Sequence, residues 1–304
     1  MKNKVAAYIT LYEDAKAASS CIQAIHAQTA PVDCLFIVDN SKTQLFEQLD
    51  HSTFILHCPA NVGVAQGLVL ALDWATAQGY DFLWAFDQDS RPDSNCLKIL
   101  LETYQKLSQD NYQIGIIAPA PIDLGTNQVL RGAVFEQDHF LPCRFVSQVY
   151  PYECDAPITS GSLISITAAK TISPPRADLF IDGVDFDYGL RLKHKGLHNL
   201  IVPKAIMYHS LGNPVKAKFL QQEVFIQRYS ALRHYYICRN YTYLATRYAQ
   251  RWYRLTSCLR RIKHLCSLIG LIVLFDPESK ALKVWASLIG TVHGLQGKLG
   301  KTWH

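Results

Sequence analysis

Several patterns that define common protein classes are absent from this sequence of 304 residues. None of its nine cysteines forms a Cys-x-x-Cys pair, so there is no zinc knuckle or dithiol redox pair. The stretch 61–67 has neither the Gly-x-Gly-x-x-Gly spacing of dinucleotide-binding enzymes nor the Gly-Lys-Ser/Thr of a P-loop. The apolar run 268–275 is shorter than a membrane-spanning helix, which needs about 20 residues. These absences argue against a dehydrogenase, a P-loop nucleoside triphosphatase and a bilayer-spanning segment in that run.

Cysteine usage and the first residues predict a cytoplasmic protein. The cysteine count is odd, and several cysteines lie in apolar runs, where a free cysteine behaves as a small hydrophobic residue. Residues 1–5 carry charge but begin no long apolar stretch with a cleavage site, so we expect no secretory signal. A reducing compartment fits both observations.

The charge is divided unevenly along the chain. Residues 1–212 hold 15 Lys/Arg and 22 Asp/Glu, a net charge of −7, whereas residues 213–304 hold 15 and 3, a net charge of +12. The basic part is also rich in aromatic and aliphatic residues, which favours an anionic membrane surface. No nucleic-acid-binding motif is present, so we expect no nucleic-acid partner. The alternative is a buried core helix with ordinary solvated arginines.

The first half of the chain alternates predicted strands with predicted helices. This order implies right-handed crossovers and an α/β fold with a mostly parallel central sheet. We expect a domain over 1–212 and a basic, mainly helical region over 213–304. The predicted strands are 5–10, 34–38, 53–57 and 82–86, and the predicted helices are 15–28 and 64–78.

One predicted strand, 82–86, ends in two carboxylates that are one residue apart. Residues i and i+2 of an extended segment point the same way, so Asp87 and Asp89 can face one cation together. Ligands of open α/β sheets bind at the carboxyl ends of strands, which is where this pair lies. The alternative is that Asp89 and Ser90 cap the following helix.

Polar residues also follow the other predicted strands. Asp39 ends the second strand, where an acidic residue can bind the base or ribose of a nucleotide, although Asp-Asn-Ser is also common turn chemistry. Asn61 and Gly63 lie at a helix start, where backbone N–H groups can meet a phosphate. Together with 10–13, these positions predict one polar edge of the sheet.

A second acidic cluster lies at 182–187. Asp185 and Asp187 are candidate general bases, because partial burial can raise a carboxyl pKa toward neutrality. The alternative is that Asp182 or Asp185 caps a helix and Asp187 forms a structural pair with Arg191. The hydroxyl-rich stretch that contains Ser160 and Gly161 precedes this cluster, and His209 follows a predicted strand as a candidate metal or diphosphate contact.

The order of these motifs resembles the inverting family 2 glycosyltransferases of the GT-A fold, and within them the bacterial rhamnosyltransferase-like branch. The similarity extends from Val5 to Lys301. It is carried by the segments 38–41, 61–65, 87–90, 160–162 and 180–191, by His209, by the Arg239-Asn240 pair and by 290–301.

The resemblance implies a role for each candidate. Asp185 would be the catalytic base, and Asp89, Asp87 and His209 would hold Mg²⁺ or Mn²⁺, with Asp89 the more direct ligand. Ser160, Gly161, Asp187 and Arg191 would contact the acceptor or support the site. The residues implied for nucleotide-sugar binding are Thr10, Tyr12, Glu13, Asp39, Asn61, Gly63, Asp87 and Gln88.

The resemblance also implies a reaction and its partners. We expect transfer of a sugar, with rhamnose from dTDP-rhamnose favoured over a UDP-sugar, to a lipid-linked oligosaccharide in bacterial cell-surface polysaccharide synthesis. The protein would be peripheral on the inner face of the cell membrane, and its oligomeric state is left open. Two alternatives are a haloacid-dehalogenase-like phosphatase that uses Asp87 and Asp89, and a non-catalytic membrane-surface binding protein.

Overall fold

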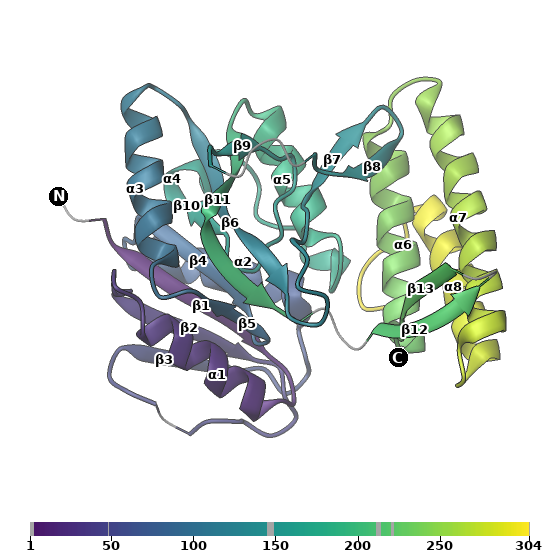
Figure 1. The fold of residues 1–304 in the computed structure, drawn as a ribbon, viewed down its shortest axis with the longest axis horizontal. Coiled ribbons are helices and arrows are strands. Elements are labelled where there is room, and N and C mark those ends of the chain that lie inside the picture. The colour runs from purple at the N-terminus through teal and green to yellow at the C-terminus, as the bar shows by residue number, and fades with distance from the viewer. Residues whose placement is uncertain (1–2, 48, 145–148, 211–213, 220–221, 304) are drawn as a thin grey trace. The chain divides into compact units, whose positions relative to one another are not determined.

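A computed structural model describes residues 3–47, 49–144, 149–210, 214–219 and 222–303 (Figure 1). The chain divides into two compact units. The sheet unit comprises Met1–Val134, Pro142–Ala177 and Val184–Ser210, and the helical unit comprises Phe135–Leu141, Asp178–Gly183 and Leu211–His304. The basic region expected over 213–304 therefore falls in the helical unit, which also includes two short internal segments. The expected boundary between residues 212 and 213 lies outside the described residues.

The sheet unit is built on a central sheet whose first four strands are parallel and match the predicted ones. Their spatial order is β3-β2-β1-β4, so consecutive strands are joined by helical or loop crossovers. Three of them, β1, β2 and β4, are buried along nearly their whole length, as expected for strands covered on both sides, whereas the edge strand β3 exposes Phe54 and Leu56. The four strands are β1 (Val5–Leu11), β2 (Cys34–Asp39), β3 (Thr53–His57) and β4 (Phe82–Asp87).

The second half of the sheet is mixed. The short strand β10 lies antiparallel between β4 and β6, and the long strand β11 pairs parallel with β6 and antiparallel with β5. The strands β7 and β8 form a separate hairpin. The bounds are β5 (Ser90–Pro92), β6 (Ile114–Asp123), β7 (Ala133–Glu136), β8 (His139–Pro142), β9 (Tyr152–Glu153), β10 (Leu163–Ser165) and β11 (His198–His209).

Helices cover both faces of this sheet. α1 and α3 contribute Ile22 and Leu97 to the core that contains Ile9 of β1. The neighbouring residue Tyr8 points the other way, toward Gly67 of α2, because alternate residues of a strand face opposite sides. The α/β class with a mostly parallel, doubly covered sheet is thus confirmed. The helices are α1 (Ala15–His26), α2 (Gly63–Ala77), α3 (Cys96–Gln109), α4 (Ile166–Ala169) and α5 (Val184–His194). A short 3-10 helix, η1 (Ala177–Leu179), lies between α4 and α5 in the chain.

The helical unit contains a hairpin and three long helices, which agrees with the expected mainly helical region. Gly290 and Gly294 of α8 lie against the backbone carbonyls of Tyr235 and Arg239 on α6, so a side chain at either glycine would collide with backbone. Among the described residues, no helix is both long and apolar enough to cross a membrane. The elements are β12 (Pro214–Phe219), β13 (Gln222–Gln227), α6 (Ala231–Tyr248), α7 (Tyr253–Phe275) and α8 (Lys280–Gln296).

Candidate active site

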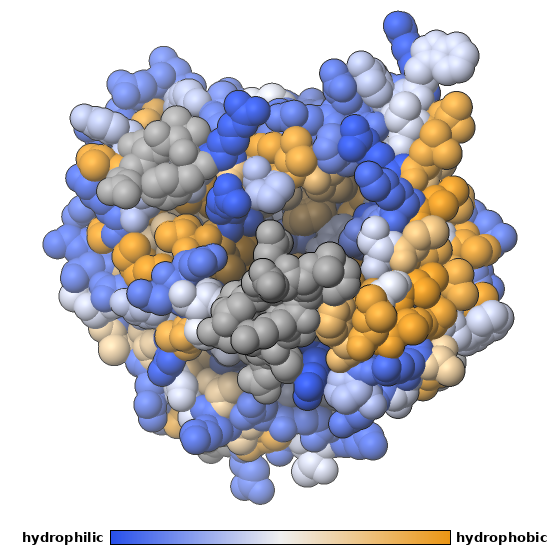
Figure 2. Space-filling view, turned by 45° about the vertical axis from the view of Figure 1, so that its right-hand side comes forward, coloured by the Kyte–Doolittle hydropathy of each residue, from blue (hydrophilic) through white to orange (hydrophobic). Residues whose placement is uncertain are grey.

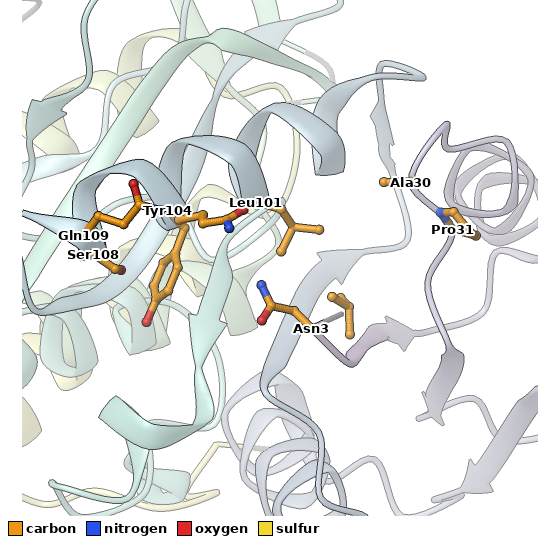
Figure 3. A pocket seen from close by; sticks show the side chains of 9 residues that line it. Asn3, Ala30, Pro31, Leu101, Tyr104, Ser108 and Gln109 are labelled. Atoms are coloured by element: carbon orange, nitrogen blue, oxygen red, sulfur yellow. The ribbon is translucent and has the colours of Figure 1, made fainter. Parts of the chain in front are cut away.

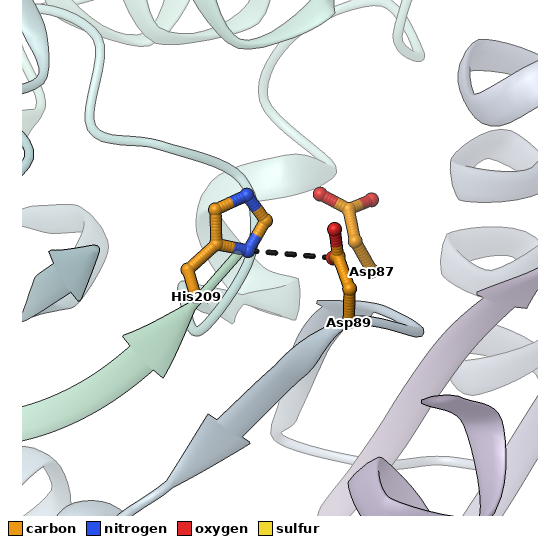
Figure 4. Close-up of side chains that lie close together, drawn as sticks. All are labelled: Asp87, Asp89 and His209. Carbon is orange, nitrogen blue, oxygen red and sulfur yellow. Dashed lines mark ion pairs between the residues drawn. The ribbon is translucent and has the colours of Figure 1, made fainter. Parts of the chain in front are cut away.

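Two carboxylates and one histidine meet at the carboxyl-terminal edge of the sheet. Asp87 ends β4, Asp89 lies in the turn before β5, and His209 ends β11 (Figure 4). One ligand atom from each residue lies within 4.8 Å of the other two, and Nδ1 of His209 is 3.4 Å from Oδ1 of Asp89. His209 is buried, whereas the two aspartates are half-buried. The edge therefore offers two anionic oxygen ligands and one nitrogen ligand to a single cation.

The donor chemistry of this group fits a divalent metal ion. Carboxylate oxygens suit Mg²⁺ and Mn²⁺, and an imidazole nitrogen is a common ligand of transition metals. Cys21 lies beneath the carboxylates, with its Sγ 3.7 Å from the carbonyl oxygen of Asp87. Burial, and then the charges of Asp89 and Asp87, raise the pKa of the Cys21 thiol well above its ordinary value. Cys21 therefore stays protonated and does not add a thiolate ligand.

A chain of hydroxyl groups supports the histidine from behind. The backbone N–H of Asp87 donates to Oγ of Ser160 at 3.0 Å, and this oxygen is 2.6 Å from Oγ of Ser90. Oγ of Ser90 is in turn 2.7 Å from Nδ1 of His209. Both serines are buried. Because Nδ1 is engaged by Ser90, Nε2 is the ring nitrogen that remains for a metal ion or a phosphate oxygen.

The loop after β1 is fastened to the turn that carries the aspartates. The side chain of Gln88 accepts from the backbone N–H of Tyr12 at 2.7 Å and donates to the Tyr12 carbonyl at 3.0 Å. The Tyr12 ring is half exposed. Oε1 of Glu13 accepts from the backbone of Lys42, and Oγ1 of Thr10 accepts from Asn40. Gln88 thus acts as a bridge between two loops of the predicted site.

Asp39 is fully buried and bonds to backbone. Its Oδ1 accepts from the N–H of Ser41 at 2.9 Å, and its Oδ2 accepts from the N–H of Leu45 at 2.7 Å. These contacts are the turn chemistry that the sequence left open as an alternative. In this structure Asp39 shapes the loop after β2, and any contact with a nucleotide would have to use the remaining lone pairs of its oxygens.

The start of α2 is already partly capped. Oδ1 of Asn61 accepts from the N–H of Gly63 at 3.0 Å, and Oδ1 of Asn40 accepts from the N–H of Val62 at 2.8 Å. Asn61 has a positive φ of 50°, which asparagine tolerates better than most residues. These two N–H groups are therefore engaged within the protein, and the role of Asn61 seen here is to form the turn.

In the second acidic cluster, Asp187 forms a structural ion pair, whereas Asp185 lies at the start of a helix. Asp187 is buried and pairs with Arg191 at 2.7 Å, and Arg191 also donates to the carbonyls of Ser173 and Pro174. Asp185 lies in the first turn of α5, is half-buried, and accepts from the N–H of Phe186 at 3.0 Å. Among the described residues, Asp185 is not a member of the Asp87–Asp89–His209 group.

Gly161 has a clear structural reason to be glycine. Its φ is +82°, and a Cβ there would lie 2.6 Å from Sδ of Met207. Its carbonyl accepts from the indole N–H of the fully buried Trp84 at 2.9 Å. The turn at Gly161 therefore holds Ser160 in place beneath β4.

A separate cavity of about 480 Å³ lies elsewhere on the sheet unit (Figure 3). It is lined by the amino-terminal start of β1, by the loop at Ala30 and Pro31, and by Leu101 and Tyr104 of α3. Since the candidate site follows the carboxyl ends of the strands, this cavity opens at the other end of β1. None of the predicted site residues lines it.

Residues 7–145 match the sequence model of glycosyl transferase family 2. The match covers 139 of the 304 residues, and this segment is the glycosyl transferase family 2 domain of the chain. The dTDP-rhamnosyl transferase RfbF of Shigella flexneri is 27% identical to this chain over 188 residues, which cover 59% of the chain and 58% of that protein.

Similarity to solved structures shows the GT-A fold. The crystal structure of GalNAc-T7 with UDP, GalNAc and Mn²⁺ has a TM-score of 0.60 at 13% identity, covering 95% of this chain and 54% of that one. The structure of residues 1–349 of S. aureus TarS has a TM-score of 0.52 at 12% identity, covering 96% and 80%. The matches thus span little more than half the length of RfbF and of GalNAc-T7.

The sequence did not predict two supporting roles at this site. Ser90 was part of the 87–90 motif and a possible helix cap, but not a partner of His209, and Asp123 was not a candidate. Asp123 ends β6 opposite His209, is buried, and its Oδ2 accepts from the N–H and hydroxyl of Thr126 at 2.9 and 2.6 Å. An apolar run that ends in an aspartate, 114–123, was the available signal.

Replacing Ser90 with alanine tests the hydroxyl chain. We expect the Ser90→Ala protein to bind Mn²⁺ about 10–100-fold more weakly, because the partner that orients a metal-binding histidine is lost. Titration of Mn²⁺ followed by electron paramagnetic resonance measures this affinity. Ser94→Ala, at an exposed position of the following loop, is the matched control. Equal affinities in both variants would contradict the supporting role.

Proposed function

We propose that the chain is an inverting glycosyltransferase that moves a sugar from a nucleoside diphosphate sugar to a lipid-linked saccharide. The observation that carries the proposal is the meeting of Asp87, Asp89 and His209 at the strand ends of a family 2 domain. The family match also argues against the phosphatase alternative for Asp87 and Asp89. A non-catalytic binding protein would not need three ligand atoms within 4.8 Å of one another.

Asp87, Asp89 and His209 would hold the metal ion, and the imidazole favours Mn²⁺ over Mg²⁺. When bound, the ion would neutralise negative charge that develops on the departing nucleoside diphosphate. Two neighbouring carboxylates disfavour each other's charge, so this edge of the sheet is suited to a cation. Gln88 and Tyr12 would keep the loops on either side of the diphosphate at a fixed separation.

We propose Asp185 as the general base that removes the proton from the attacking hydroxyl group. Asp187 is buried and held by Arg191, whereas Asp185 is half-buried in the first turn of α5, which supports Asp185 as the base. Single displacement by the activated hydroxyl inverts the configuration at the sugar carbon. Similarity to the dTDP-rhamnosyl transferase RfbF supports dTDP-rhamnose as the donor.

The helical unit supports a location at an anionic membrane surface. Exposed apolar residues recur along one stripe of α7 at Trp252, Leu255, Leu259 and Ile262, and α8 exposes Leu282, Trp285, Val292 and Leu295. Exposed basic residues, including Arg254, Arg260 and Lys263, lie on the same helix as the first stripe. Figure 2 shows hydrophobic side chains gathered on its right-hand side. An apolar stripe flanked by positive charge is the pattern of a helix that lies in the interface of an anionic bilayer.

The nucleotide and metal site is tested by calorimetric titration. We expect dTDP to bind in the presence of Mn²⁺, and we expect Asp89→Ala to weaken this binding by about 100-fold or more, since removing a ligand costs at least as much as removing its supporting partner. Asp73→Asn, at an exposed position of α2, should bind as the unmodified protein does. A parallel titration with UDP compares the affinities for the two nucleotides. If neither nucleotide binds with or without Mn²⁺, the proposed function is wrong.

Replacing the proposed base separates binding from chemistry. We expect Asp185→Asn to slow the release of dTDP from dTDP-rhamnose, with water as acceptor, by about 10²–10⁴-fold, because proton removal in the transition state is lost. Affinity for dTDP with Mn²⁺ should not change. The rate is measured by chromatography of released dTDP, and Asp73→Asn again serves as control. An unchanged rate in Asp185→Asn would exclude this residue as the base.

Membrane association is tested by co-sedimentation with lipid vesicles. We expect binding to vesicles that contain phosphatidylserine and little binding to phosphatidylcholine vesicles, with weaker binding at high salt because salt screens the charges. The double variant Leu255→Gln, Leu259→Gln should bind at least about tenfold more weakly, since burying one leucine contributes about 1.5 kcal/mol or more. Phe54→Gln, at an exposed apolar position of β3, is the control. No preference for phosphatidylserine at low salt would refute the membrane proposal.

A further inference from the structure

A strained segment of the helical unit leads directly into the helix that carries Asp185. Residues 178–183 belong to the helical unit, and Val184 begins α5 of the sheet unit. Phe180 and Asp182 have positive φ angles of 65° and 63°, although neither is glycine. This conformation is sterically disfavoured for residues with a side chain, so contacts from outside the segment must maintain it.

Asn240 of α6 supplies three of those contacts. Its side-chain amide nitrogen lies 2.9 Å from the carbonyl oxygen of Leu179, 2.7 Å from that of Ile181 and 2.8 Å from that of Asp182. Asn240 is fully buried. One amide group thus contacts three carbonyls of the strained segment, and buried carbonyls need such donors.

Arg239, the preceding residue of α6, donates further hydrogen bonds to the same segment. Its Nη2 donates to the carbonyls of Asp178 and Leu179 at 3.1 and 3.0 Å, and its Nη1 donates to the carbonyl of Gly300. Its Nε donates to Oδ1 of Asn240 at 2.8 Å, which orients the asparagine. The guanidinium lies 4.7 Å from the ring centre of Tyr236. Arg239 is fully buried, so every one of these donors faces protein.

The segment ends at a glycine that is itself restricted. Gly183 has a φ of +81°, and a Cβ at this position would lie 3.0 Å from Cδ1 of Leu244 and 3.6 Å from Cβ of Asn240. α6 therefore fixes both the carbonyls and the last residue of the segment. Asp185 follows two residues later in the first turn of α5.

We propose that Arg239 and Asn240 are positioning residues that hold segment 178–183 in its strained conformation and thereby fix where α5 begins and where Asp185 is placed. The inference rests on the proposed role of Asp185 as the base. A planar guanidinium and a side-chain amide suit this task, because each presents several donors in a rigid arrangement to backbone carbonyls. A misplacement of about 1 Å at the base can lower a reaction rate by about 10²-fold.

The test compares Asn240→Asp with the unmodified protein. Aspartate keeps the size of the side chain and still accepts from Arg239, but it removes the amide donor to three carbonyls. Arg239→Lys removes the planar guanidinium with its several donors but keeps the charge. Arg247→Lys, at an exposed position of the same helix, is the matched control. Should Asn240→Asp fail to fold, as judged by its thermal transition, Arg239→Lys and Gly183→Ala carry the same comparison.

Two measurements are made on each full-length variant. Hydrogen–deuterium exchange of peptides that cover 178–188 should be about tenfold faster in Asn240→Asp and unchanged in Arg247→Lys, because opening of a locally weakened segment controls exchange. Release of dTDP from dTDP-rhamnose should be about 10²-fold slower, with Mn²⁺-dependent dTDP affinity unchanged. Exchange at 184–188 that does not differ from the unmodified protein would overturn the proposal.

The two proposals fail in different ways. If the unmodified protein neither binds dTDP nor releases it from dTDP-rhamnose, the proposed function fails, while the exchange data still decide whether α6 fixes the start of α5. If exchange at 184–188 accelerates and the release rate stays the same, the segment is structural only and the positioning role is refuted.

Discussion

The pairing of β11 with two other strands is the constraint on which the candidate site depends. His209 lies opposite Asp123 of β6 and opposite Ser90 of β5, and both pairings are fixed by backbone hydrogen bonds. A shift of β11 by one residue would turn His209 to the other face of the sheet and remove it from the carboxylates. The Ser160–Ser90 chain adds side-chain contacts to the same place. A histidine from late in the chain thus completes a carboxylate pair that begins more than a hundred residues earlier.

The chemistry of the site follows from how charges are paired around it. Arg191 neutralises the buried Asp187, and the buried Asp39 is satisfied by backbone N–H groups, so neither negative charge is left buried without compensation. Asp87 and Asp89 have a different environment, since they lie together at a half-buried edge with His209. A divalent cation is the partner that suits such a pair. In the first turn of α5, the half-buried Asp185 likewise differs from the buried, ion-paired Asp187.

The helical unit combines two properties that the proposed function needs. Helices α7 and α8 expose apolar residues and basic charge, whereas α6 holds a fully buried arginine. Burial lowers the pKa of Arg239, but its five hydrogen-bond acceptors and two neighbouring tyrosine rings keep the guanidinium compensated. Removing the partners of such a buried cation is strongly destabilising, because it leaves an uncompensated charge. This network stabilises the segment before α5.

The sequence by itself determined the local features of this protein. The strands 5–10, 34–38, 53–57 and 82–86 and the helix over 64–78 were predictable, because apolar periodicity and turn residues act over a few neighbouring positions. The placement of Asp87 and Asp89 at a strand end was predictable for the same reason. The tertiary structure alone decided that Ser90 and Ser160 join Asp87 to His209, and that Asn240 holds the carbonyls before Asp185. These contacts join residues 58 to 119 positions apart, and they depend on strand register and helix packing, which no local pattern specifies.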